Sequence, residues 1–438
     1  MLCEICNTNH TFVAKYYYDG SVKIMDYNKK IELHCEKVSA IKYLNDNILY
    51  AIRQGYTELD IIIKEERTFS NICVPIAGIL KYYENTKDVK FNITMPAGGY
   101  IKHTHIDNPL IVQENMNNCI IQNPFDKVWF FSTDREIYEL INYYLLSIRQ
   151  ADIIAEGVIT SIEWCLNEVL DNILQHSDIG EGYIMGQIHP NSKRLSFCIF
   201  DAGIGIYNSL RKSNVHNPLS PLDAITMALQ EKVTRDNNIG QGNGLWGLSN
   251  IILQANGLLR VSSGGATYIN NSGENNTINY GHFNLGKALG TTTIDFQLDY
   301  SKKMDISEAL TGYSYQPVDL WLENIESDED ENIVLIDVYE KSNGTGTRKS
   351  AEKLRNMIIN IIINNQKKIV LDFNGVNFIS SSFADELIGK IIKEQGFVFF
   401  TQTLKMINLK PVIVNIINRS VEQRMAQTYY DNNIKIEE

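Results

Sequence analysis

The chain has 438 residues, of which 44% are hydrophobic and 21% are charged, and its formal net charge is −12. This length predicts roughly three domains, and the acidic balance disfavours nucleic acid as a partner because it provides little general affinity for a phosphate backbone. No apolar run reaches the ~18 residues of a membrane-spanning helix, and the first ten residues do not resemble a secretory signal, so we expect a soluble, cytoplasmic protein without membrane contact.

The N-terminal part of the chain predicts a small α/β domain. Residues 55–93 have the pattern strand, loop, helix, strand, and residues 366–400 repeat it, with Phe69 and Phe378 standing before the two helices. We therefore predict that residues 1–120 form a small α/β domain related to the one at the C terminus.

Seven cysteines are scattered along the chain, which predicts reduced thiols rather than a disulfide framework. Cys3 and Cys6 have the CxxC spacing of a zinc site, with His10 nearby and His34 and Cys35 further on. No second pair of matching spacing follows, so strand cysteines in a small domain are the alternative to a metal site.

Residues 126–300 predict a central domain. Thr133 and Glu136 have the spacing of a capping box and open an amphipathic helical pattern. Strand patterns follow later, at 194–203 and 291–300. Helices first and sheet afterwards predict an α+β sandwich rather than a doubly wound sheet.

The helix predicted around residues 163–177 carries a polar stripe on an apolar background. Glu168, Asn172 and His176 recur every four residues, so they lie on one helix face. A carboxylate beside a carboxamide suits a magnesium–nucleotide site, because Mg²⁺ prefers oxygen ligands and a carboxylate can deprotonate an attacking water. A solvent-facing polar stripe is the alternative.

Two glycine-containing motifs follow this helix. Asp201 ends a predicted strand and precedes Gly203 and Gly205, so its carboxylate could accept the exocyclic amine of adenine, although DxGxG is also a common turn. A glycine-rich loop then leads into a helical pattern, where exposed backbone N–H groups suit phosphates. Its glycines are Gly240, Gly242, Gly244 and Gly247.

Taken in order, ExxxNxxxH, DxGxG and GxGxGxxG, followed by Gly290-Thr291 at the start of a strand, resemble the GHKL superfamily of gyrase, the ninety-kilodalton heat-shock chaperone, histidine kinases and MutL-type proteins. The resemblance covers about 126–300 and implies a Bergerat-type α/β sandwich that binds ATP and Mg²⁺. It also implies that Glu168 is the general base for water and that Asn172 is the magnesium ligand.

The remaining nucleotide contacts follow from the same resemblance. Asp201 is implied to contact adenine, and the Thr291 hydroxyl is implied to lie near the adenine edge. The other implied contacts are His176 at the end of the first motif, Gly203 and Gly205 beneath the base, and Gly240, Gly242 and Gly244 in a loop over the phosphates.

The segment 207–238 between two of these motifs is either a lid or an ordinary surface insert. If it is a lid, Thr234 and Arg235 could meet a γ-phosphate. Glu168 argues against a histidine kinase, because such kinases usually lack an acidic base there, and no helix with a phosphoacceptor histidine is evident.

The last third of the chain predicts an acidic linker at 301–331 and a second small domain at 332–438. Hydrophobic periodicity lapses after Asp299, and the linker ends in the run ENIESDEDEN. Beyond it, GTRKSAEKL and IVLDFNGVNFISSSFADELIGKI resemble a STAS-like domain of unknown function related to anti-sigma-factor antagonists.

Ser380, Ser381 and Ser382 occupy the strand-to-helix junction at which a GHKL kinase phosphorylates such antagonists. The chain departs from the antagonists' Asp-Ser-Ser-Gly pattern, and serines before a helix commonly cap it. Asp385 and Glu386 in the first turn favour the helix dipole but would repel a phosphate.

These resemblances lead to three hypotheses. The first is an ATP-hydrolysing regulatory switch, in which nucleotide binding changes how the flanking STAS-like domains engage each other or a protein partner, as in chains of bacterial stress response or phage defence. The second is an anti-sigma-type serine/threonine kinase acting on a STAS-like domain, and the third is a nucleotide-gated scaffold without hydrolysis. A homodimer is a further expectation, since GHKL ATPases often dimerise on ATP.

Overall fold

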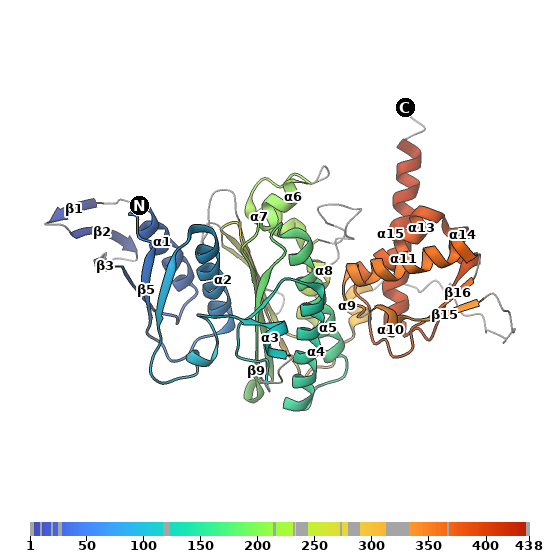
Figure 1. The fold of residues 1–438 in the computed structure, drawn as a ribbon, viewed down its shortest axis with the longest axis horizontal. Helices are drawn as coiled ribbons and strands as arrows, with labels where there is room; N and C mark the ends of the chain where they lie inside the picture. Colours follow the sequence, from blue (N-terminus) through green and yellow to red (C-terminus); the bar gives the residue numbers. More distant parts are fainter. Residues whose placement is uncertain are drawn as a thin grey trace.

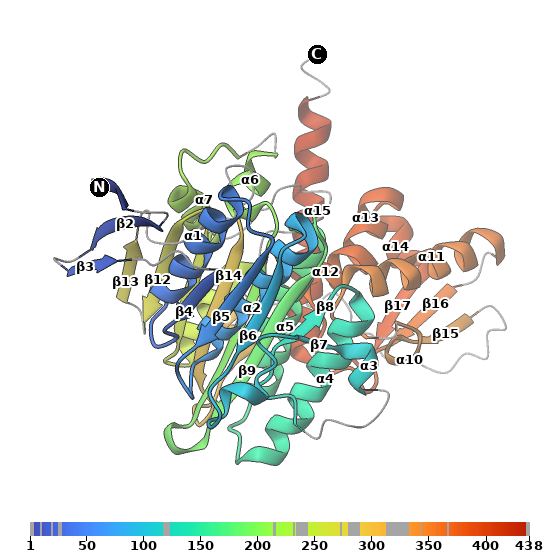
Figure 2. The ribbon, with the colours of Figure 1, turned by 60° about the vertical axis from the view of Figure 1, so that its left-hand side comes forward.

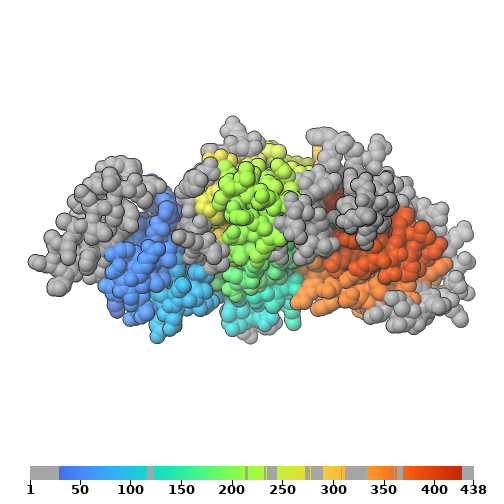
Figure 3. All heavy atoms as spheres, turned by 90° about the horizontal axis from the view of Figure 1, so that it is seen from above, coloured from blue at the N-terminus to red at the C-terminus, as the bar shows by residue number. Residues whose placement is uncertain are grey.

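The chain folds into three units that lie in a row along the molecule, with the N-terminal unit at one end and the C-terminal unit at the other (Figures 1 and 3). The predicted multidomain α+β fold is confirmed. The computed structural model describes residues 4–8, 11–18, 21–24, 29–116, 123–212, 216–230, 233, 244–271, 274–278, 290–311, 333–342, 344–365 and 368–434.

The N-terminal unit contains two small sheets. The first is antiparallel, and its strands are β1 (Glu4–Thr8), β2 (Thr11–Tyr18) and β3 (Ser21–Ile24). The second is parallel, and its strands are β4 (Lys30–Leu33), β5 (Glu58–Ile63) and β6 (Lys90–Thr94). Parallel strands need long crossovers. Two helices provide them, α1 (Ser39–Arg53) and α2 (Ser70–Lys87).

The central unit is built on an eight-stranded sheet of order β13-β12-β11-β14-β10-β9-β8-β7. Its strands are β7 (Leu110–Ile111), β8 (Trp129–Phe131), β9 (Gly182–His189), β10 (Arg194–Asp201), β11 (Leu258–Ser263), β12 (Ala266–Asn271), β13 (Glu274–Ile278) and β14 (Thr292–Asp299). The predicted strands at 194–203 and 291–300 correspond to β10 and β14, which pair in antiparallel register.

Helices cover both faces of this sheet (Figure 1). On one face lie α4 (Asp134–Ala151), α5 (Val158–His176) and α8 (Gly244–Gln254). On the other face α2 of the N-terminal unit packs against β9 and β10, as Figure 2 shows with that unit in front. The sheet is therefore covered on both faces around β9 and β10, and these two strands are buried along almost their whole length.

The start of α4 confirms the predicted capping box. The Thr133 hydroxyl accepts a hydrogen bond from the Glu136 N–H at 3.3 Å, and the Glu136 carboxylate accepts one from the Thr133 N–H at 3.1 Å. Two of the N–H groups that a helix start leaves unpaired are satisfied in this way.

The C-terminal unit is a second three-stranded parallel sheet with helices around it. Its strands are β15 (Ile333–Asp337), β16 (Lys368–Asp372) and β17 (Leu404–Ile407). Its helices are α10 (Val338–Ser342), α11 (Arg348–Asn365), α12 (Ser381–Ala384), the π-helical turn η3 (Asp385–Gly389), α13 (Lys390–Gln395), α14 (Phe397–Thr403) and α15 (Pro411–Ile434). The strand order β15-β16-β17 matches β4-β5-β6, so the repeat seen in the sequence corresponds to the same sheet topology.

One element of that repeat was predicted wrongly. Residues 397–400 were expected to form the last strand, but they begin α14, and the strand β17 follows. Gly396, at φ 89°, ends α13 and redirects the chain, after which Phe400 is buried while Val398 is 66% exposed. Four consecutive apolar residues cannot distinguish a strand from one turn of helix without such tertiary information.

The expected linker also begins later than residue 301. A short helix, α9 (Ile306–Thr311), packs against α8 and α15, and Met304, Ile306 and Leu310 are buried. The segment has too few apolar residues to give a periodic helical signal in the sequence. Their burial depends on the apolar surfaces of α8 and α15, which only the tertiary structure brings together. Residues 312–332, with the acidic run, lie outside the described residues.

Two hydrophobic cores hold the units together. One is continuous from the sheet and α5 through α9 to the C-terminal unit, and the other joins the N-terminal unit to the opposite face of the sheet. Contact between the central and C-terminal units is close, because a Cβ added to Gly346 would lie 1.8 Å from the Asn167 amide oxygen. Within the described parts of the chain, no helix combines the length and apolar character needed to cross a membrane.

Candidate functional site

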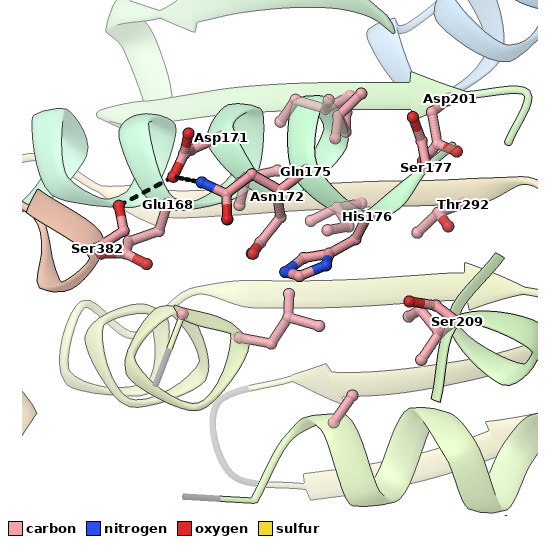
Figure 4. Close-up of a pocket in the computed structure, with 18 of the residues that line it drawn as sticks. Glu168, Asp171, Asn172, Gln175, His176, Ser177, Asp201, Ser209, Thr292 and Ser382 are labelled. Atoms are coloured by element: carbon pink, nitrogen blue, oxygen red, sulfur yellow. Dashed lines mark hydrogen bonds between the residues drawn. The ribbon is translucent and has the colours of Figure 1, made fainter. Parts of the chain in front are cut away.

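The polar stripe of α5 faces a single cavity. Glu168, Asn172 and His176 all line it, together with residues of the sheet and of the C-terminal unit. Glu168 is only 7% exposed, so its carboxylate lies inside the molecule rather than on a solvated helix face. Figure 4 shows Asn172 and His176 pointing from α5 into the space beneath the helix.

Asp201 lies at one end of this cavity, at the end of β10 (Figure 4). Its Oδ1 atom accepts a hydrogen bond from the Gly203 N–H at 2.9 Å. Burial raises the pKa of Asp201 to about 7, although hydrogen bonds from Gly203 and the Thr292 side chain oppose the shift. Asp201 is therefore a buried acceptor that keeps part of its capacity for an N–H donor.

The two glycines after Asp201 have different surroundings. Gly205 lines the cavity at φ 75°, and a Cβ there would lie 1.7 Å from the Gly290 carbonyl oxygen, so only glycine fits. Gly203 does not line the cavity, but a Cβ there would lie 2.3 Å from the Ser177 carbonyl oxygen. Both therefore permit a close backbone approach beneath Asp201.

Thr292 lines this cavity, and the predicted Thr291 does not. Thr292 pairs with Asp201 across the β10–β14 ladder and lines the cavity. Thr291 lines a separate, small cavity between the sheet and the N-terminal unit, beside Asn71 and Asp295. Successive residues entering a strand point to opposite faces, so a one-residue shift moves a side chain to the other side of the sheet.

The predicted phosphate loop is described only at its end. A Cβ on Gly244, the first residue of α8, would lie 3.0 Å from Glu168 Oε2 and 3.1 Å from Asn172 Nδ2. The start of α8 thus faces the two polar side chains of α5 directly. Four of the predicted nucleotide contacts lie outside the described residues: Thr234, Arg235, Gly240 and Gly242.

The lid segment is described in part. It contains most of the helix α6 (Gly205–Arg211) and all of α7 (Pro221–Ala228). Ser209 of α6 and Ala228 of α7 line the cavity. These two helices therefore form a wall of the cavity rather than a detached surface insert.

The opposite end of the cavity is closed by the C-terminal unit. The Ser381 N–H donates to Glu168 Oε1 at 2.9 Å, and the Ser382 hydroxyl donates to Asp171 Oδ2 at 2.9 Å. Asp171 also accepts from Gln175 Nε2 at 2.6 Å, as Figure 4 shows. Both units thus contribute directly bonded groups to one site.

The three serines have separate roles at this junction. The Ser380 hydroxyl accepts from the Phe383 N–H at 3.0 Å and caps α12, as expected for a serine before a helix. Ser380 is fully buried, whereas Ser381 and Ser382 line the cavity. Only the latter two face the polar groups of α5.

Asp171, Gln175 and Arg348 are cavity residues that sequence reasoning missed. Asp171 and Gln175 lie three and seven positions after Glu168, a spacing that would have placed them beside the stripe. Arg348 begins α11 of the C-terminal unit, and no local pattern connects it with α5.

Burial determines the electrostatics at this end of the cavity. It raises the pKa of Glu168 to about 7, against the opposing effects of the Ser381 N–H and Arg348. It also raises the pKa of Asp171 to about 6, against hydrogen bonds from Ser382 and Gln175. A carboxylate with a pKa near 7 is matched to accepting and releasing a proton at neutral pH.

The cavity therefore offers different chemistry at its two ends. At one end, Asp201 presents a carboxylate beside a hydroxyl, which suits an amine donor. At the other, Glu168 and the Asn172 amide offer oxygen ligands for a hard cation, beside the start of a helix and Arg348, which suit anions. This donor set fits a magnesium-bound nucleotide.

The zinc prediction depends mainly on side chains that the structure does not describe. Cys3 and His10, and the side chain of Cys6, lie outside the described parts. His34 Nδ1 lies 2.9 Å from Glu65 Oε1, and Cys35 is buried. Within the described ranges, no group of three His, Cys, Asp or Glu side chains is arranged for a metal ion.

Residues 350–414 match the family model described as the STAS-like domain of unknown function (DUF4325). The matched segment runs from α11 into α15 and includes the three serines. The C-terminal unit is thus a STAS-like domain, as its sequence predicted. No curated protein matches the chain.

Proposed function

We propose that the central domain binds and hydrolyses magnesium-ATP as a GHKL-type domain, and that the nucleotide state controls how the STAS-like domain is docked and which protein partner it meets. The observation that best supports this proposal is the shared cavity. Its walls come from α5, β10 and β14 on one side and from Arg348, Ser381 and Ser382 on the other. A ligand there touches both domains, so its binding must change their interaction.

In this proposal the adenine lies at the Asp201 end. Its exocyclic amine donates to the buried carboxylate, and the Thr292 side chain, which hydrogen-bonds Asp201, keeps that carboxylate in place. Gly205 allows the backbone to approach the base closely. A buried acceptor that loses its donor is costly, which gives the site its preference for an amine at this position.

The phosphates lie at the Glu168 end, near the start of α8. The Asn172 amide oxygen would hold Mg²⁺, which supplies charge neutralisation and polarises the terminal phosphate. Glu168 orients the attacking water and takes its proton. Its pKa of about 7 makes it a stronger base than an exposed glutamate and still leaves a substantial deprotonated fraction at neutral pH.

Docking and hydrolysis compete for the same carboxylate in this scheme. The Ser381 N–H donates to Glu168 Oε1 and stabilises the charged form, which lowers the basicity of Glu168. Undocking would free that oxygen for water. The docked STAS-like domain thus restrains hydrolysis, and a partner that binds the STAS-like domain would release the restraint.

The test follows the γ-phosphate of labelled ATP, comparing wild-type protein with Glu168→Ala. We expect wild type to release free phosphate slowly, and Glu168→Ala to bind ATP without releasing it. Wild-type protein that binds ATP but never turns it over would exclude the hydrolytic role and favour the nucleotide-gated scaffold.

A second candidate function rests on Ser382. Its hydroxyl donates to the buried, Gln175-bonded Asp171 within the same cavity, an arrangement in which a base holds a nucleophile. We propose self-phosphorylation of the STAS-like domain as the alternative: the Ser382 oxygen forms the new bond to the γ-phosphorus, ADP leaves, and Asp171 takes the proton. Label retained on the denatured chain, and lost in Ser382→Ala, would establish it over hydrolysis.

A further inference from the structure

The guanidinium of Arg348 lies between the STAS-like domain and the cavity. Its Nη1 atom donates to Glu386 Oε2 at 2.9 Å and lies 3.3 Å from Asp385 Oδ2, both within the STAS-like domain. Arg348 also lines the cavity beside Glu168 and Asp171, and its side chain is only 13% exposed.

Two of its nitrogens have no acceptor. Nε and Nη2 of Arg348 are buried and make no hydrogen bond within the described residues. Leaving a buried donor unpaired is unfavourable, and more so when the donor is charged. A ligand that supplies acceptors in the cavity would satisfy both nitrogens.

The acidic partners of Arg348 do not need its charge. Asp385 is held by both Nε and Nη2 of Arg424 at 2.6 Å. Glu386 is held by Lys390 at 2.7 Å and by Arg355 at 3.3 Å. Each carboxylate therefore keeps a cation without Arg348, whose charge is available to a further anion.

The position of Arg348 relative to α5 is well defined. Gly346, two residues earlier, packs so closely on Asn167 that a Cβ would overlap its side chain. Ser381 and Ser382 attach the same domain to Glu168 and Asp171. The guanidinium is therefore held at the Glu168 end of the cavity, away from Asp201.

We propose that Arg348 of the STAS-like domain binds the terminal phosphate of a nucleoside triphosphate in this cavity, so that the docked domain distinguishes a triphosphate from a diphosphate. This inference rests on the proposed nucleotide site. The fork of an arginine matches two phosphate oxygens, and Nε with Nη2 is the pair of donors left for them. ATP then strengthens the docking of the STAS-like domain, and ADP does not.

The test measures the affinity of the full chain for a non-hydrolysable ATP analogue and for ADP, with magnesium, by calorimetry. Arg348→Gln should weaken binding of the analogue about 10- to 100-fold and change ADP binding less than about twofold. Arg348→Lys, which keeps the charge but loses the fork, should fall between wild type and Arg348→Gln. Arg355→Gln is the matched control, because Arg355 lies on the same helix and pairs with Glu386 but does not line the cavity, and it should change neither affinity.

Each other result counts against the inference. Unchanged analogue binding in Arg348→Gln would exclude the contact while leaving the nucleotide site intact. An equal loss for the analogue and ADP, or the same loss in Arg355→Gln, would assign Arg348 a role in the fold of the STAS-like domain instead. Wild-type protein that binds neither nucleotide would refute the nucleotide site itself, and the inference with it.

Discussion

Replacing Ser381 with proline isolates the hydrogen bond that connects the STAS-like domain to Glu168. Ser381 is the first residue of α12, where the N–H has no partner within the helix and proline is well tolerated. The preceding Ser380 has φ −74° and ψ 160°, the extended conformation that a residue before proline prefers. The substitution therefore removes the interdomain donor and leaves α12 intact.

The expected effect follows from the chemistry of the bond. A hydrogen bond to a charged group contributes about 1.5–3 kcal/mol, which corresponds to roughly a 10- to 150-fold change in the docking equilibrium. The proline ring also places a methylene where the proton was, so Glu168 must move away from its 2.9 Å contact. Ser381→Ala is the matched control, because it loses the hydroxyl as proline does but keeps the N–H.

Hydrogen exchange measures this change without requiring ATP. Amides of α12 and of α5 around Glu168 should exchange about 10- to 150-fold faster in Ser381→Pro than in Ser381→Ala, because exchange follows local opening. In a Glu168→Ala background the difference between proline and alanine should vanish or reverse. Equal exchange in the two variants, or the same difference without Glu168, would refute the view that this bond holds the domains together.

Three further predictions concern the same site. Asp201→Asn should weaken ATP binding about 10-fold or more by calorimetry, because the site loses its buried carboxylate acceptor, and unchanged affinity would place adenine elsewhere. Gly346→Ala should lower the thermal midpoint, because the added Cβ would lie 1.8 Å from the Asn167 amide oxygen. Adding Asn167→Ala should restore most of the lost thermal midpoint, and failure of this rescue would assign the defect to the Gly346 backbone. Burial raises the pKa of Glu168 from 4.5 to about 7 and that of Asp201 from 3.8 to about 7, so the folded state binds more protons than the unfolded state in this range. The stability that these carboxyls contribute is present below about pH 4 and is lost as pH rises to 7. The thermal midpoint of wild type should therefore fall between pH 5 and 8, and Asp201→Asn should make this fall smaller. An unaltered dependence of the thermal midpoint on pH would contradict the buried carboxyl.

Much of the local structure could be predicted because it depends on neighbouring residues. The capping box at Thr133 and Glu136 needs only a spacing of three residues, and the stripe of α5 needs only the period of a helix. The sequence did not predict the secondary structure of segments whose conformation depends on a packing partner elsewhere in the chain. Residues 306–311 were assigned to a linker, yet they form α9 because α8 and α15 provide an apolar surface for them.

The residues of the cavity also divide into those that the local sequence predicts and those that only tertiary packing brings there. The stripe on α5, Asp201 with its glycines, and the serine junction were evident from the sequence, because residue type and helical or strand period are local properties. Only the tertiary structure placed Thr292 rather than Thr291 beside Asp201 and brought Arg348 to the cavity. Ser381 and Glu168 are 213 residues apart, and no periodicity acts over that distance. Their contact depends on how two separately patterned domains pack, which is a property of complementary surfaces and not of any segment alone.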